Sequence, residues 1–161
     1  GEYRPDRMIC LISPELPPPV QERGDFLPLA TQKSIEILYK GSTEHFFLMV
    51  EGAQIDWGGH QNESAYIVDE MLDFDRAIAH ALDFAKIDGE TLVVITADHE
   101  TGGYSINNGS MEKGTVEGKF TSDYHTATMV PIFAYGPGAA SFTGIMDNTE
   151  IFYKLKYLMG L

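Results

Sequence analysis

Short runs of consecutive apolar residues alternate with segments of helical periodicity, and this alternation constrains the fold more than any other feature. Each run is short enough for a buried strand. The runs are Phe46–Val50, Thr91–Thr96 and Val130–Tyr135. Helices are expected over Leu29–Tyr39, from Asn62 or Glu63 to Gly89, and over Asp147–Met159. We therefore predict an α/β fold, with helices on both faces of a partial and mostly parallel sheet.

Turn and cap residues refine these expectations. Residues 104–124 are rich in Gly and Asn and predict a loop or loose hairpin around Asn108-Gly109. The last helix is expected to be capped by Asn148 or Thr149 and to stop at Gly160. The acidic residues of the long helix are interpreted as its solvated face. They are Asp69, Glu70, Asp73 and Asp83.

The length of 161 residues fits one domain. Residues 1–28 are rich in proline and predict a connecting segment with one weak strand at Met8–Ile12. Three strands are few for a sheet flanked by helices, so residues 1–161 are expected to form a single partial domain, with 29–161 as its body. Such a sheet would leave an exposed edge, which predicts self-association or marginal stability.

The charge balance excludes several classes of partner. Eleven basic residues stand against 24 acidic ones, a net charge of −13, which disfavours nucleic acid and anionic membrane surfaces. No apolar run approaches the roughly 18 residues of a membrane span. The single cysteine, Cys10, excludes a disulfide framework and a four-cysteine zinc site.

Candidate metal ligands gather around the predicted strands. In an open α/β sheet the functional site lies beyond the carboxyl ends of the strands. Glu51, Asp56 and His60 follow the first apolar run, and Asp98 and His99 follow the second. His125 stands just before the third run. Imidazole nitrogen and carboxylate oxygen both suit Zn²⁺. The sequence therefore predicts a metal site at this edge.

The local spacing makes two further predictions. Gly58-Gly59 separates Asp56 from His60, which favours a tight loop over a regular helix. Asp98 and His99 are adjacent, so they can share one metal only where the strand has already ended.

Each signal also has a simpler interpretation. An isolated Asp-x-x-x-His pair is usually a surface feature. His45 and His80 are interpreted as core or capping residues, and Trp57 on its own would be a packing residue. Metal-ligating residue types at three strand ends are harder to explain in this way.

At these residues the sequence resembles the alkaline phosphatase family. The matching stretches are VEGAQIDWGGH, TADHETGG, HTATMVPIFAYGPGA and DNTEIF, in that order. They extend from Phe46 to about Tyr153. The resemblance implies an incomplete α/β three-layer sandwich, the carboxy-terminal portion of a phosphate-monoester hydrolase that uses two zinc ions and a phosphoserine.

The resemblance also implies a role for each candidate. Asp56, His60 and His125 correspond to the ligands of one zinc ion, and Asp98 and His99 to two ligands of a second. Glu51 corresponds to a carboxylate ligand of a nearby magnesium ion. Trp57 stands beside the phosphate, where family members carry Lys, His or Trp, which leaves the identity of the third metal open.

Other family features are missing. The family's nucleophile follows an aspartate in an Asp-Ser dipeptide, which this sequence lacks, and no arginine stands near a predicted strand end. The arginines are Arg4, Arg7, Arg23 and Arg76. The chain alone is therefore expected to be inactive, with the amino-terminal half of the same protein as its partner. The resemblance further implies a homodimer in the periplasm or outside the cell, although residues 1–13 do not read as a signal peptide.

Two other functions remain open at this stage. One is a metal-dependent hydrolase of another ester, of the sulfatase or phosphodiesterase type. The other is a metal- or phosphate-binding module without turnover.

Overall fold

The computed structural model describes residues 13, 16–42 and 44–161. The weak strand expected at Met8–Ile12 lies outside the described residues. The helices are α1 (Val20–Arg23), α2 (Phe26–Gly41), α3 (Gln54–His60), α4 (Ser64–Asp88) and α5 (Asn148–Leu158), with a 3-10 turn at Ala139–Phe142. The strands are β1 (Val93–Ile95), β2 (Glu100–Thr101), β3 (Ser105–Ser110), β4 (Thr115–Lys119), β5 (His125–Thr126) and β6 (Phe133–Tyr135).

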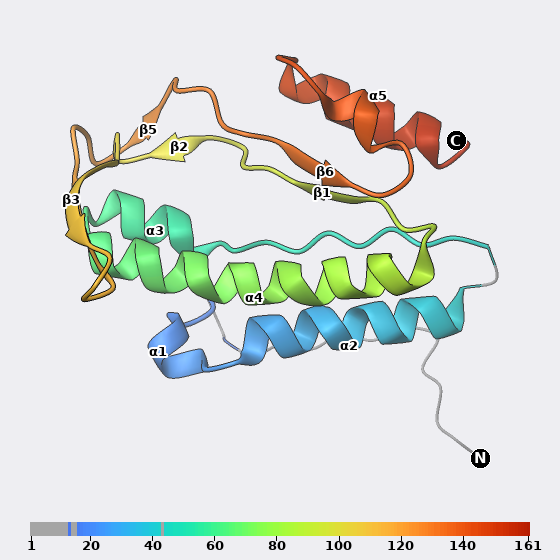
Figure 1. Cartoon of the computed structure of the whole chain (residues 1–161), viewed down its shortest axis with the longest axis horizontal. Helices are drawn as coiled ribbons and strands as arrows, with labels where there is room; N and C mark the ends of the chain where they lie inside the picture. The colour runs from blue at the N-terminus through green and yellow to red at the C-terminus, as the bar shows by residue number, and fades with distance from the viewer. Residues whose placement is uncertain (1–12, 14–15, 43) are drawn as a thin grey trace.

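The long helix α4 is the centre of the fold (Figure 1). It packs along α2 on one side, and on the other it faces the pair formed by β1 and β6. Helix α5 lies on the opposite side of this pair from α4. The fold is therefore α/β with helices on both sides of the strands, as predicted.

The predicted parallel sheet is wrong for the described residues. The strands form three separate pairs, β1 with β6, β2 with β5 and β3 with β4, and all are antiparallel. The reason lies in the connection between β1 and β6. No crossover helix joins them; the chain runs out through β2, reverses at the β3–β4 hairpin and returns through β5.

The apolar run at Phe46–Val50 was predicted to be a strand but has no strand partner among the described residues. Its side chains nevertheless alternate as in a strand. Phe47 and Met49 are 57% and 77% exposed, whereas the Phe46 ring lies 6.4 Å from that of Phe84 on α4. The segment has one covered face and one open face.

The helix termini follow simple capping chemistry. Gly89 ends α4 in the left-handed conformation, with its N–H on the carbonyl of Ala85 at 2.9 Å, as expected from the sequence. Helix α2 begins at Phe26, three residues earlier than predicted, because Pro28 sits in its first turn, where no backbone N–H is required. The cap of α5 is Asp147, not Asn148 or Thr149, since its carboxylate accepts the N–H of Thr149 at 2.9 Å.

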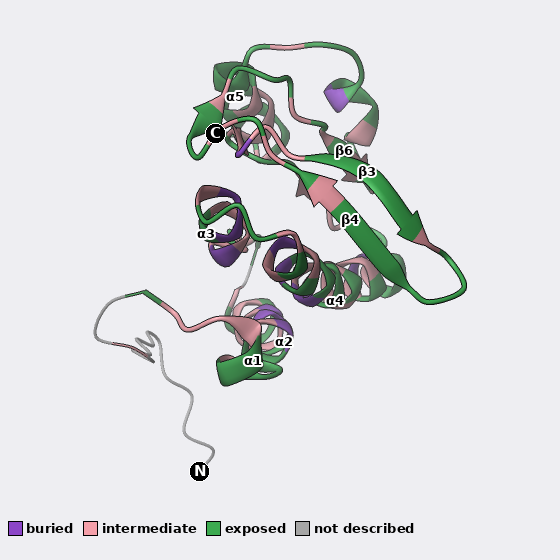
Figure 2. Cartoon of the chain, turned by 90° about the vertical axis from the view of Figure 1, so that its left-hand side faces the viewer, coloured by how far each residue is buried: buried purple, intermediate pink, exposed green. Residues whose placement is uncertain are grey.

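The hairpin between β3 and β4 also differs in detail. The strands pair from Ser105 with Lys119 to Ser110 with Thr115. The turn is therefore at 111–114, and Asn108-Gly109 lies within β3. Figure 2 shows the buried residues concentrated on α2, α3 and α4, while the hairpin is almost entirely exposed.

Two acidic residues of α4 are buried, which corrects their interpretation as a solvated face. Glu70 and Asp73 are each only 1% exposed. Both carboxylates contact the Arg23 guanidinium of α1 at 2.6 Å, and Glu70 also accepts the N–H of Val20 at 2.7 Å. Ion pairs and hydrogen bonds thus hold residues 20–23 of the proline-rich segment against α4.

Candidate metal centre

Helix α3 carries Asp56 and His60 one turn apart on the same face. The expected tight loop is therefore wrong. Asp56 Oδ2 lies 3.4 Å from His60 Nε2. Each of the two glycines between them is about 1 kcal/mol less favourable in a helix than alanine. Glycine is nevertheless required here, because the helix packs closely against its neighbours. A Cβ on Gly58 would lie 2.9 Å from Ile67 Cγ1, and one on Gly59 would lie 2.8 Å from the carbonyl oxygen of Thr101.

A short strand pair brings a third ligand to this helix. In the β2–β5 pair Thr101 stands opposite His125. His125 Nε2 lies 3.6 Å from Asp56 Oδ1. One ligand atom from each of Asp56, His60 and His125 lies within 4.8 Å of the others. Asp56 and His60 are half-buried and His125 is exposed, so the cluster is open to solvent on one side.

Asp98 and His99 lie beside this cluster. Strand β1 ends at Ile95, so both residues are free of strand geometry. His99 Nε2 lies 3.3 Å from Asp98 Oδ2, and its ring stacks on that of His125 with centroids 3.6 Å apart. The other ring nitrogen, Nδ1, is 4.0 Å from Asp56 Oδ1.

Glu51 and Trp57 are more peripheral. Glu51 is exposed at the end of the unpaired segment and lies outside the three-residue cluster. The Trp57 ring is partly exposed, with its centroid 6.0 Å from that of His60. The family resemblance placed Trp57 near the site, and its ring distance to His60 agrees with that placement.

A backbone carbonyl fixes the orientation of the His60 ring. His60 Nδ1 lies 2.7 Å from the carbonyl oxygen of Asp123, which can only accept a hydrogen bond. Nδ1 therefore carries a proton, and Nε2 is the ring nitrogen that faces Asp56. This is the arrangement of a metal-binding histidine with its outer partner in place.

Glu100 holds the loop that carries the ligands, and sequence analysis did not identify this role. Its carboxylate accepts hydrogen bonds from the N–H groups of Gly103 at 3.1 Å and Tyr104 at 2.9 Å, and from the Thr126 hydroxyl. Partial burial works to raise the pKa of Glu100, but these hydrogen bonds outweigh it and hold the pKa below its usual value. The carboxylate thus ties the end of β2 to β5, next to His99 and His125.

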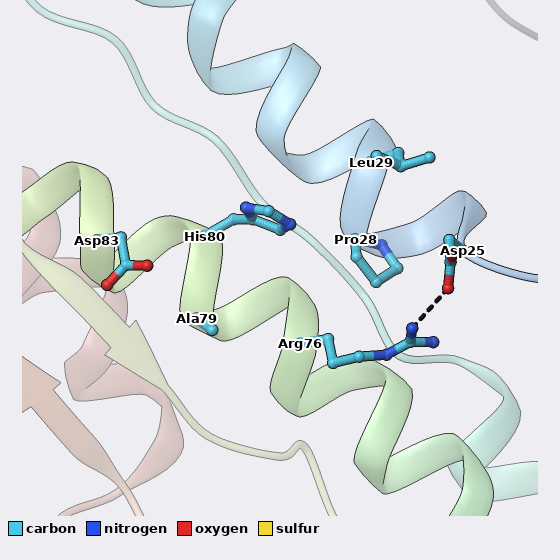
Figure 3. A pocket seen from close by; sticks show the side chains of 7 residues that line it. All are labelled: Asp25, Pro28, Leu29, Arg76, Ala79, His80 and Asp83. Atoms are coloured by element: carbon cyan, nitrogen blue, oxygen red, sulfur yellow. Dashed lines mark hydrogen bonds and ion pairs between the residues drawn. The ribbon is translucent and has the colours of Figure 1, made fainter.

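A hollow of about 350 Å³ between α2 and α4 contains none of the predicted ligands (Figure 3). Its lining residues are Asp25, Pro28, Leu29, Arg76, Ala79, His80 and Asp83. Arg76 is paired with Asp25 across it at 2.5 Å, so its strongest charge is already neutralised. The three-residue cluster of Asp56, His60 and His125 is the better candidate site.

The close contact of α3 with β2 makes a testable prediction. Gly59→Ala should lower the free energy of unfolding by up to about 2 kcal/mol. Overpacking against a backbone carbonyl costs about 1–3 kcal/mol, and the better helix propensity of alanine recovers about 1 kcal/mol of it. Urea unfolding monitored by circular dichroism measures the change. Gly41→Ala is the matched control, because a Cβ there meets nothing within 4 Å; equal stabilities of the two variants would contradict the prediction.

Comparison with known proteins gives consistent matches. The family described as Alkaline phosphatase matches residues 26–119 and 113–161. The alkaline phosphatases of Escherichia fergusonii and Escherichia coli are each 35% identical to the chain over 162 residues, covering 89% of it. The chain spans 34% of the length of either relative. None of the described helices combines the length and hydropathy of a membrane-crossing segment.

Solved structures match as well. The structure of alkaline phosphatase from the Antarctic bacterium TAB5 is 45% identical, with a TM-score of 0.81, over 89% of this chain and 43% of that one. A variant of the TAB5 protein, with a TM-score of 0.79 over 88% of this chain and 44% of that one, has Mg bound in the M3 site.

Proposed function

The chain belongs to the alkaline phosphatase family, and from that premise we propose that the protein containing it hydrolyses phosphate monoesters at a centre to which this chain contributes zinc ligands. One observation carries the proposal. Asp56, His60 and His125, from helix α3 and strand β5, bring their ligand atoms within 4.8 Å of one another.

The donor chemistry fits zinc. Two imidazoles and one carboxylate are a typical set of protein ligands in catalytic zinc sites, which leave a further coordination position open. The solvent-exposed side of the cluster supports such a position. A zinc ion held there would supply a Lewis acid for a phosphoryl oxygen. The chain itself orients the ligands, through α3, the β2–β5 pair and the hydrogen bond from His60 to Asp123.

We assign Asp98 and His99 to a second, incomplete zinc site. Their facing atoms are 3.3 Å apart and adjoin the first cluster through the stacked rings of His99 and His125. Glu51 is proposed as one ligand of a third site, for magnesium, with Trp57 next to the substrate phosphate; the magnesium in the related TAB5 variant supports that choice.

The nucleophile is proposed to lie outside this chain. Three serines, at the starts of α4 and β3 and after β4, are engaged elsewhere. Ser64 shares a hydrogen bond with the Tyr104 hydroxyl at 2.7 Å, Ser105 donates to Asn107 at 3.1 Å, and Ser122 accepts the N–H of Tyr124 at 3.0 Å. None of these contacts involves the cluster. A phosphoserine mechanism therefore needs the remainder of the protein.

Exposed apolar residues support the need for a partner segment. On β6 and α5 they are Phe133, Tyr135, Phe152, Tyr153 and Tyr157, and the open face at residues 47–49 adds to them. We propose that the amino-terminal part of the same protein covers these faces. The whole protein is proposed to be a homodimer located in the periplasm or outside the cell.

The test compares the chain with the whole protein. The zinc-loaded chain should hold about one zinc ion, because it supplies one nearly complete site. It should hydrolyse 4-nitrophenyl phosphate no faster than buffer, since the uncatalysed reaction is among the slowest known. The whole protein should turn over this ester and not 4-nitrophenyl sulfate. Chelator-sensitive turnover by the homogeneous chain would contradict its inactivity, and preference for the sulfate would contradict the proposed substrate class.

A further inference from the structure

The Thr101 hydroxyl lies between two candidate ligands assigned to different zinc sites. It donates a hydrogen bond to Asp56 Oδ1 at 2.5 Å. The same oxygen is 3.1 Å from Nδ1 of His99. Asp56 belongs to the three-residue cluster and His99 to the second, incomplete site. Thr101 therefore links the two proposed sites by hydrogen bonds to one ligand of each.

Counting protons assigns the direction of both bonds. An ionised carboxylate only accepts, and a hydroxyl has one proton and two lone pairs. The hydroxyl proton is therefore used on Asp56, and only a lone pair faces His99. The Nδ1 atom of His99 must then carry the ring proton and donate it to Thr101. Its Nε2 atom, 3.3 Å from a carboxylate oxygen of Asp98, is then the ring nitrogen available to a metal ion.

The surroundings of Thr101 hold its side chain in place. A Cβ on Gly59 would come within 2.9 Å of Thr101 Cβ and 3.0 Å of its Cγ2, so the threonine packs directly on α3. Its backbone pairs with His125 in the β2–β5 ladder. A β-branched side chain has few rotamers, and these contacts keep the hydroxyl aimed at Asp56 and His99.

We propose that Thr101 is a positioning residue that orients Asp56 for the first zinc and sets the tautomer of His99 for the second. The proposal rests on the proposed function, because it concerns ligands of that centre. Neutral histidine binds a metal through the nitrogen that carries no proton, and the partner of the other nitrogen decides which one that is. One hydroxyl would thus prepare ligands in both sites.

The test uses Thr101→Val, which keeps the shape and removes the hydroxyl, and Thr101→Ser, which keeps the hydroxyl. Zinc affinity is measured by competition with a chromophoric chelator. Loss of an outer partner weakens metal binding about 10–100-fold, so the valine variant should fall in that range and the serine variant should recover most of the affinity. Thr115→Val, on the exposed strand β4, is the matched control and should leave affinity unchanged.

A second readout needs no metal and reports the hydrogen bond itself. In the chain labelled with 15N histidine, at roughly pH 8.5 where free histidine is neutral, His99 should show a protonated Nδ1. His99→Gln assigns the signal. The valine variant should shift His99 toward the tautomer protonated on Nε2, an effect that lost packing alone would not produce.

The outcomes separate the two proposals. If the wild-type chain binds no zinc, the proposed zinc centre is wrong. The His99 tautomer, measured without metal, still tests the role of Thr101. If zinc binds but Thr101→Val keeps both the affinity and the His99 tautomer, only the role of Thr101 is overturned. If the valine variant does not fold, the wild-type chain still provides a test. A His99 ring that is protonated on Nε2 there would overturn the role of Thr101.

Discussion

Replacing Arg23 by methionine is expected to lower the free energy of unfolding by about 3–5 kcal/mol, a large part of the stability of a single domain. The reason is the pair of carboxylates that Arg23 neutralises. The side chains of Glu70 and Asp73 are 1% and 0% exposed, and each contacts the guanidinium at 2.6 Å. Without it, Glu70 keeps the N–H of Val20, which carries no positive charge, and Asp73 keeps the half-exposed Arg76 as its cation.

Arg76→Met provides the matched control. Arg76 also contacts Asp73, at 2.7 Å, and contacts Asp25 at 2.5 Å, but its own side chain is 51% exposed. Exposed ion pairs contribute about 0–1 kcal/mol, so this variant should lose far less stability. Urea unfolding monitored by circular dichroism compares the two. An Arg23→Met variant that does not fold agrees with the prediction, whereas equal losses for both arginines would refute it.

The same network shows where sequence reasoning fails. Spacing along α4 correctly placed its end at Gly89 and predicted an apolar face that includes Ile67, Met71 and Ala85; Ile67 and Ala85 are buried, whereas Met71 is 50% exposed. It could not show that Glu70 and Asp73 are buried. Their partner Arg23 lies about 50 residues away in the sequence, in a segment that composition described only as rich in proline.

Strand direction failed for a related reason. Apolar runs indicate burial, and two of the three runs contain the paired strands β1 and β6. Direction depends on the path between strands, and here a hairpin excursion replaces the crossover helix that a parallel pair needs. The run at 46–50 keeps the alternation of a strand but has no strand partner among the described residues.

The candidate site was largely predictable, and its local geometry was not. Ligand-type residues around the predicted strands gave six candidates, the family resemblance grouped Asp56, His60 and His125 among them, and the structure brings these three together. The helix around Gly58-Gly59 was missed because propensity disfavours it, and only the close approach of Ile67 and Thr101 explains it. The outer partners, such as the carbonyl of Asp123, leave no signal in residue type.

Zinc binding by the chain is expected to weaken on the order of 100-fold or more in His125→Ala. A lost ligand costs more than a lost outer partner, which alone costs about 10–100-fold. His125 suits the test because its side chain is 38% exposed, so its removal should disturb folding little. Elemental analysis after gel filtration gives the zinc content, and chelator competition gives the affinity. His45→Ala is the control, since this histidine is exposed and stands outside the cluster.

A parallel His60→Ala variant tests whether the ligands converge on one ion. His60 comes from helix α3 and His125 from strand β5, so no local motif joins them. If one zinc ion is bound by both, each substitution alone should remove it to a similar extent. If His60→Ala abolishes binding and His125→Ala leaves it unchanged, the ion is held within α3 by Asp56 and His60 alone. The proximity of His125 would then be unrelated to zinc, and the three-ligand centre would be wrong.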